Sequence, residues 1–163
     1  GHRRENIGEA FENIMDALRF LAKNNPNIQF IYPIHPNPLV RETFVKLTKE
    51  VKNFLIIEPL EYFEFSVLMS KCFFVMTDSG GVQEEAPFLG KPVLVMREKT
   101  ERIEGVQKGV VKLVGSNVKT IIKEANILIS NKNEYNKMSK INNPYGNGKA
   151  AEKIVKVMKD RFS

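Results

Sequence analysis

A short segment near residue 80 carries residues whose types and spacing suggest chemistry. Residues 77–81 combine two hydroxyl groups, a carboxylate and two adjacent glycines, and a helical pattern follows from Val82 to about Leu89. Adjacent glycines let the backbone approach a ligand closely, and the first amides of a helix have no intrahelical partner. Because the helix dipole adds positive potential there, the segment predicts an anion site, with phosphate as the expected anion.

Glu85 adds a possible second contact in this segment. It lies six residues after Ser79, about one turn inside the helix, where its carboxylate could accept hydrogen bonds from two neighbouring sugar hydroxyls. Ser79, Gly80 and Gly81 would hold phosphate at the same helix end. A phosphate site beside a sugar site suggests a nucleotide. The alternative from spacing alone is a plain turn in which Ser79 or Asp78 caps the helix.

The elements that position this segment follow from hydrophobic periodicity. Apolar runs predict strands at residues 28–32, 54–57, 72–76, 93–96 and 110–114, with helices between them. This alternation predicts an α/β fold in which one parallel sheet has helices on both faces. Ligands of such sheets bind at the carboxyl ends of the strands. The residues that follow these strands, and that we therefore expect along one edge, include His35, Phe65, Ser79 and Arg102.

The first helical pattern begins almost at residue 1, with no strand before it. Because a helix of this kind normally follows a strand, we expect the first strand of the sheet to be absent from this sequence. His2 would follow that strand. Beside Arg3 and Arg4, a terminal histidine could also be a tag residue or a solvated surface residue. A histidine at a helix start can instead donate to a phosphate or transfer a proton near neutral pH.

Length and composition predict one ordinary globular domain. The chain has 163 residues, of which 42% are hydrophobic and 27% charged. Its net charge of +6 is spread along the chain without an interleaved basic and aromatic patch, so we expect no nucleic-acid partner. The single cysteine, Cys72, is expected in the core and favours a reducing compartment. No apolar stretch approaches the length of a membrane span, and we expect a cytoplasmic protein without membrane contact.

The sequence also resembles a known enzyme family. Residues 77–95, TDSGGVQEEAPFLGKPVLV, closely resemble the nucleotide-binding segment of the non-hydrolysing UDP-N-acetylglucosamine 2-epimerases, which have the two-domain GT-B fold. Five more segments resemble this family in the expected order: HRREN at 2–6, YPIHPNP at 32–38, EPLEYFEF at 58–65, REKTERIEG at 97–105 and NNPYGNG at 142–148. The resemblance implies a C-terminal, Rossmann-like, nucleotide-sugar-binding domain over 1–163, the second half of a GT-B-type fold.

The resemblance implies roles for further residues. His2 would be a catalytic or phosphate-contacting residue, and His35 would face the cleft between the two domains. Phe65 would lie against the uracil ring of UDP, largely through backbone contacts. Arg102 would approach the substrate from a charged loop at 97–105.

Two departures from the family pattern affect that loop. Lys99 and Ile103 stand where Thr and Pro are more usual. The loss of a proline removes a backbone restraint, so we expect a looser loop around Arg102.

The implied activity is interconversion of UDP-N-acetylglucosamine and UDP-N-acetylmannosamine, through elimination and re-addition of UDP. The carboxylates that handle the C2 proton would belong to an N-terminal domain that this sequence lacks, so we expect the fragment alone to be inactive. We expect no cofactor and no metal ion, and a homodimer for the intact enzyme. The alternatives are the UDP-binding half of a hydrolysing epimerase or GT-B glycosyltransferase, or a truncated module that binds without catalysis.

Overall fold

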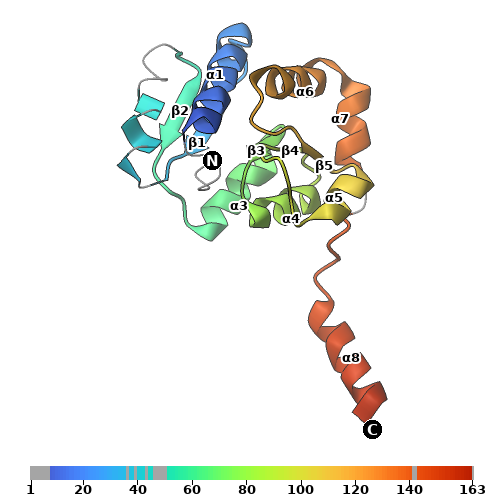
Figure 1. Ribbon diagram of the computed structural model, residues 1–163. Helices are drawn as coiled ribbons and strands as arrows, with labels where there is room; N and C mark the ends of the chain where they lie inside the picture. Colours follow the sequence, from blue (N-terminus) through green and yellow to red (C-terminus); the bar gives the residue numbers. More distant parts are fainter. Residues whose placement is uncertain are drawn as a thin grey trace.

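The computed structural model describes residues 8–35, 37–38, 40–42, 44–45, 51–140 and 143–162 (Figure 1). Between the first two strands, the described residues from 38 to 45 are mostly helical. The elements in chain order are α1 (Glu9–Asn24), β1 (Phe30–Pro33), β2 (Phe54–Ile57), α3 (Tyr62–Lys71), β3 (Val75–Thr77), α4 (Gly80–Phe88), β4 (Val93–Val95), α5 (Ile103–Lys108), β5 (Val111–Leu113), α6 (Val118–Ser130), α7 (Lys132–Ser139) and α8 (Ala150–Phe162).

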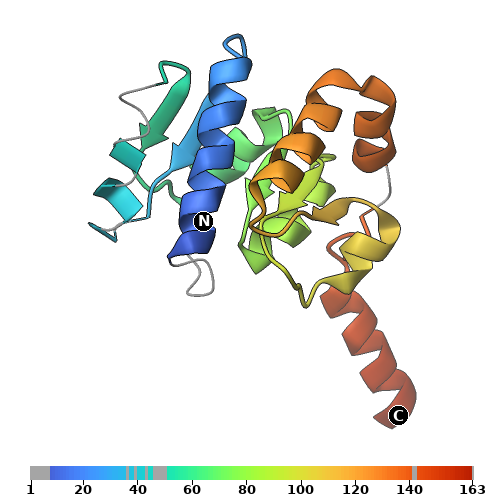
Figure 2. The ribbon, with the colours of Figure 1, turned by 45° about the horizontal axis from the view of Figure 1, so that its top comes forward.

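All five strands pair in parallel, as predicted, but they form two sheets rather than one. β1 pairs with β2, and β4 lies between β3 and β5. Within the described residues β1 and β3 are not hydrogen-bonded to each other, and Figures 1 and 2 place the two sheets in separate halves of the body. The prediction of one continuous sheet is therefore wrong for this part of the chain, since no described strand joins β1 to β3.

Helices cover both faces of the three-stranded sheet, which confirms the predicted layers. The alternating side chains of β4 contribute to both hydrophobic clusters. Leu94 belongs to the larger cluster with residues of α1 and α6, whereas Val93 and Val95 belong to a smaller cluster with Met69 of α3. A strand that is apolar on both faces is typical of a parallel sheet buried between two helical layers.

The larger cluster joins the two sheets into one body. α1 places four large apolar residues at helical spacing on its buried side, and α1 and α6 are in contact. The same cluster contains Phe54 from β2 and Leu94 from β4, so α1 and α6 pack over a core that both sheets share. The buried apolar residues of α1 are Ile14, Met15, Leu18 and Leu21.

Several boundaries and burial predictions differ from the sequence interpretation. β3 begins at Val75 rather than Cys72, because Cys72 ends α3: its amide donates to the Leu68 carbonyl. Cys72 is half-buried rather than fully in the core. Tyr62 and Phe63 fit the helical spacing of core residues, yet they are 72% and 78% exposed, so that interpretation is wrong for both.

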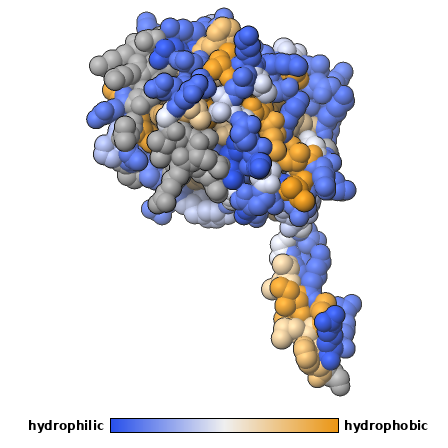
Figure 3. Space-filling model, in the orientation of Figure 1, coloured by the Kyte–Doolittle hydropathy of each residue, from blue (hydrophilic) through white to orange (hydrophobic). Residues whose placement is uncertain are grey.

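The last helix, α8, projects from the body (Figure 1). None of its described residues is buried. Its apolar side chains recur every three or four residues and form a stripe along one side, which Figure 3 shows as an exposed hydrophobic surface. The stripe comprises Ile154, Val155, Met158 and Phe162, which are 59%, 50%, 54% and 84% exposed.

None of the helices in the described part of the chain combines the length and the hydropathy that a membrane span requires.

Candidate functional site

The first turn of α4 presents unpaired amides at the carboxyl end of β3. The helix begins at Gly80, two residues before the predicted start at Val82. Ser79 occupies the N-cap position, but its side chain makes no capping hydrogen bond, and its amide donates to the Thr77 hydroxyl at 3.0 Å. No acceptor among the described residues bonds the amides of Gly80, Gly81 or Val82. This helix end therefore keeps open donors that an anion can accept from.

Glu85 lies at the same end of the helix. A Cβ built on Gly81 would be 3.4 Å from the Glu85 Oε1 atom, so the carboxylate folds back beside the first turn. Within the described part of the chain, this carboxylate has no hydrogen-bond or ion-pair partner. Its oxygens are thus free to accept from ligand hydroxyls, the role predicted for Glu85, and that role stays a prediction.

Arg102 places its guanidinium against Gly80. A Cβ on Gly80 would lie only 3.1 Å from the Arg102 Cζ atom, which means that glycine permits this close approach. The Arg102 Nε atom donates to Glu84 Oε1 at 2.8 Å, and Nη1 donates to Glu101 Oε1 at 2.5 Å. The hydrogen bond to Glu84 raises the pKa of the Arg102 guanidinium further above its usual value. A permanent cation therefore stands beside the open amides.

The loop that carries Arg102 is tied to α4 through a buried side chain. Gln83 is fully buried; its Nε2 atom donates to the Ser79 carbonyl at 3.1 Å, and its Oε1 atom accepts from the Thr100 hydroxyl at 2.6 Å. The Thr100 hydroxyl in turn accepts from the Arg102 amide at 3.1 Å. Arg97, which is 9% exposed, pairs with Glu101 at 3.1 Å. These contacts fix the loop to the first turns of α4.

The expectation of a loose charged loop up to Gly105 is accordingly wrong. Residues 103–105 form the first turn of α5 rather than a loop. Ile103 stands at the first position of that helix, where Pro is favoured because its φ suits a helix start. Here the hydrogen bonds of Thr100 and the pairs of Glu101 supply the restraint that the proline would have added.

Tyr145 reaches this loop from a distant part of the chain. Its hydroxyl accepts from the Gly105 amide at 3.1 Å and donates to the Arg102 carbonyl at 3.4 Å. Burial raises the pKa of the Tyr145 phenol, and the carboxylates of Glu104 and Glu84 raise it further against the opposing bond from Gly105. The hydroxyl therefore stays protonated, and able to donate, at neutral pH.

The other candidates lie apart from this cluster or outside the described residues. His35 follows β1, and its Nδ1 atom accepts from the Asn37 amide at 3.2 Å. Phe65 sits in the first turns of α3, where its amide donates to the Glu61 carbonyl and its half-buried side chain packs on the smaller core cluster. His2 lies outside the described residues. For these three, the predicted roles are not tested.

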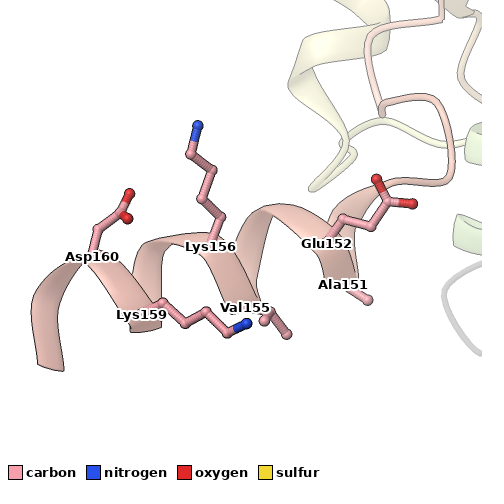
Figure 4. Close-up of a pocket in the computed structure, with 6 residues that line it drawn as sticks. All are labelled: Ala151, Glu152, Val155, Lys156, Lys159 and Asp160. Carbon is pink, nitrogen blue, oxygen red and sulfur yellow. The ribbon is translucent and has the colours of Figure 1, made fainter. Parts of the chain in front are cut away.

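Sequence reasoning missed the residues that support Arg102. Gln83 and Glu84 occupy α4 beside the predicted contacts, and the carboxylate-arginine pairing across 18 residues has no local signal. Tyr145 is 43 residues from the carbonyl that it bonds. Among the described residues, no group of His, Cys, Asp or Glu side chains could hold a metal ion. The hollow along α8 in Figure 4 is lined by that helix alone and is separate from this cluster.

Comparisons with known proteins agree on one family. The family model described as UDP-N-acetylglucosamine 2-epimerase matches residues 1–159. The chain is 55% identical over 158 residues to a UDP-N-acetylglucosamine 2-epimerase of Campylobacter jejuni, covering 97% of this chain and 41% of that protein. The chain thus spans less than half the length of such relatives.

Solved structures agree with this match. The UDP-GlcNAc 2-epimerase of Neisseria meningitidis, bound to UDP-GlcNAc, superposes with a TM-score of 0.91 at 49% identity, covering 98% of this chain and 43% of that one. The S. aureus MnaA-UDP co-structure gives a TM-score of 0.92 at 45% identity, covering 97% and 43%. At this identity the likeness extends beyond the fold. The chain therefore belongs to the UDP-N-acetylglucosamine 2-epimerase family.

Proposed function

We propose that this chain is the UDP-binding half of an enzyme that interconverts UDP-N-acetylglucosamine and UDP-N-acetylmannosamine. The observation that carries the proposal is the first turn of α4, where open amides, the Arg102 guanidinium and the free Glu85 carboxylate meet. The amides and the guanidinium suit a diphosphate, and Glu85 suits the ribose hydroxyls. The Neisseria relative, which was solved with UDP-GlcNAc bound, supports the same assignment.

In the proposed reaction, the C2 proton and the C1–oxygen bond of the sugar are lost together, which releases UDP. UDP then adds back to C1 after a proton returns to the other face of C2. Departure of UDP places negative charge on its diphosphate, and the α4 amides with Arg102 stabilise that charge. His2 would contact the phosphate or transfer a proton. The carboxylates for C2 would come from a second domain, since the described site offers none beside those that hold Arg102 or bind ribose.

The fold offers two places where the rest of such an enzyme would join. The split between β1 and β3 leaves both strands with one unpaired edge, and we propose that the missing first strand of the sheet fills it. The apolar stripe of α8 would pack on the N-terminal domain, whose presence would close the cleft over UDP. We further propose that the intact enzyme is a cytoplasmic homodimer.

A chimera tests the proposed activity. The matching C-terminal segment of the Campylobacter relative is replaced by this chain, and interconversion of the two UDP-sugars is followed by NMR. We expect an active chimera, and we expect Glu85→Ala in the same chimera to reduce activity while leaving its thermal unfolding temperature unchanged. A folded, UDP-binding chimera that leaves both sugars unchanged would contradict the epimerase assignment.

A further inference from the structure

The hydroxyl of Tyr145 occupies a position that local structure does not require. Tyr145 belongs to the 143–149 segment that leads into α8, whereas both groups that it bonds belong to the junction between the Arg102 loop and α5. A tyrosine could fill the same space with its ring alone. The hydroxyl instead makes two hydrogen bonds to backbone groups three residues apart, one as acceptor and one as donor.

The backbone of Arg102 is consequently held on both sides. On its amide side, the Thr100 hydroxyl accepts from Arg102 and is itself bonded to Gln83 of α4. On its carbonyl side, the only bond printed by the geometry of the described residues comes from Tyr145. The side chain of Arg102 can meet both Glu84 and the first turn of α4 only while this backbone stays in place.

Gly105 shows how closely the hydroxyl fits. A Cβ on Gly105 would come within van der Waals overlap of the Tyr145 oxygen, and it would also lie 3.0 Å from Val111 Cγ2. Glycine at this helical position therefore lets the phenol approach the amide that it bonds. The site thus contains a glycine fitted to Arg102, Gly80, and a second glycine fitted to Tyr145.

We propose that Tyr145 is a positioning residue, whose hydroxyl holds the start of α5 so that Arg102 stays over the anion-binding turn of α4. This inference rests on the proposed UDP site. Tyr145 touches neither the open amides nor Glu85 in any hydrogen bond, and it acts through the Arg102 backbone. Because Tyr145 lies in the segment that leads into α8, the docking of that helix and the placement of Arg102 share one connection.

Tyr135 provides a matched control within the same chain. Its hydroxyl also donates to a backbone carbonyl, that of Phe73 at 2.9 Å, and its ring stacks on Phe73 with centroids 4.3 Å apart. It lies on α7, and none of its described contacts involves the site. Tyr145→Phe and Tyr135→Phe each remove one hydroxyl, so both variants lose comparable hydrogen bonding for the fold.

The first readout is the NMR signal of the Arg102 Nε–H group in the 163-residue chain without ligand. The bond to Glu84 gives this proton a distinct shift and slow exchange with water. We expect Tyr145→Phe to shift the signal or broaden it beyond detection, and Tyr135→Phe to leave it unchanged. An unchanged Arg102 signal in folded Tyr145→Phe would overturn the proposal, whatever the chain binds.

The second readout is UDP affinity, measured by NMR titration of the same three proteins. We expect Tyr145→Phe to bind UDP about three- to tenfold more weakly than wild type, the scale of one neutral hydrogen bond, and Tyr135→Phe to match wild type. If all three proteins bind equally well, the positioning role is refuted while the UDP site stands. If wild type itself does not bind UDP, the proposed function fails, and the Arg102 signal alone decides the role of Tyr145.

Discussion

The substitution Gly80→Ala separates the stability of the fold from the binding of phosphate. Gly80 is the first residue of α4, and its φ is not positive, so alanine suits its backbone. Replacing glycine by alanine at a compatible helical position stabilises a protein by about 0.4–1 kcal/mol, because the unfolded chain loses freedom. The new Cβ would however lie 3.1 Å from Arg102 Cζ and 3.3 Å from both terminal nitrogens.

Arg102 must yield to the new methyl group, because the guanidinium is the mobile partner. A displacement of a few tenths of an ångström lengthens its 2.8 Å bond to Glu84 and moves the charge away from the open amides. A hydrogen bond to a charged group contributes about 1.5–3 kcal/mol, and we expect roughly half of that to be lost. UDP affinity should therefore fall about four- to tenfold while the unfolding temperature stays equal or rises.

The assay is a double-mutant cycle, with UDP affinity from NMR titration and stability from thermal unfolding. Gly80→Ala is compared with wild type, and the double variant with Arg102→Ala alone. If the methyl group acts by displacing the guanidinium, it has no further effect once that guanidinium is gone. Equal UDP affinity of Gly80→Ala and wild type would refute the reasoning that Arg102 contacts the phosphate. An undiminished effect in the Arg102→Ala background would instead show direct obstruction of the amides.

Further predictions concern the same site and the rest of the chain. Glu85→Ala should weaken UDP binding by about 1.5–3 kcal/mol, and calorimetry that gives wild-type affinity would remove Glu85 from the site. Gly81→Val should do at least as much harm, because its side chain blocks the backbone approach. The 163-residue chain alone should not exchange the C2 proton of UDP-N-acetylglucosamine in heavy water, and deuterium at C2 would mean that the carboxylates are misplaced. Val155→Glu with Met158→Glu should change the stability of this chain by less than about 0.5 kcal/mol, since both residues are exposed, yet inactivate the chimera.

The sequence predicts the layers of the fold well because those layers depend on local periodicity. Apolar runs mark all five strands, and the alternation with helices gives parallel pairing. The division into two sheets has no such signal, since strand neighbours are set by contacts distant in the chain. Element ends differ for a related reason: Cys72 belongs to an apolar run, but a hydrogen bond back to Leu68 assigns it to the end of α3.

The site divides in the same way. Ser79, Gly80, Gly81 and Glu85 lie within one turn-and-helix segment, so their types and spacing suffice to suggest a nucleotide site. Arg102 comes from another strand end, and only the common edge of a parallel sheet and the family resemblance point to it. The pairing of Arg102 with Glu84, and its support by Tyr145, depend on side-chain positions that no sequence spacing specifies.

The central claim is that the first turn of α4 binds the phosphates of UDP. The most direct test is the amide NMR spectrum of the 163-residue chain, recorded while UDP is added, with uridine as the ligand that lacks phosphate. We predict that UDP shifts the amide signals of Gly80, Gly81 and Val82, together with the Nε–H signal of Arg102, and that uridine shifts them far less. UDP binding that leaves these four signals in place, or equal shifts with uridine, would contradict the account.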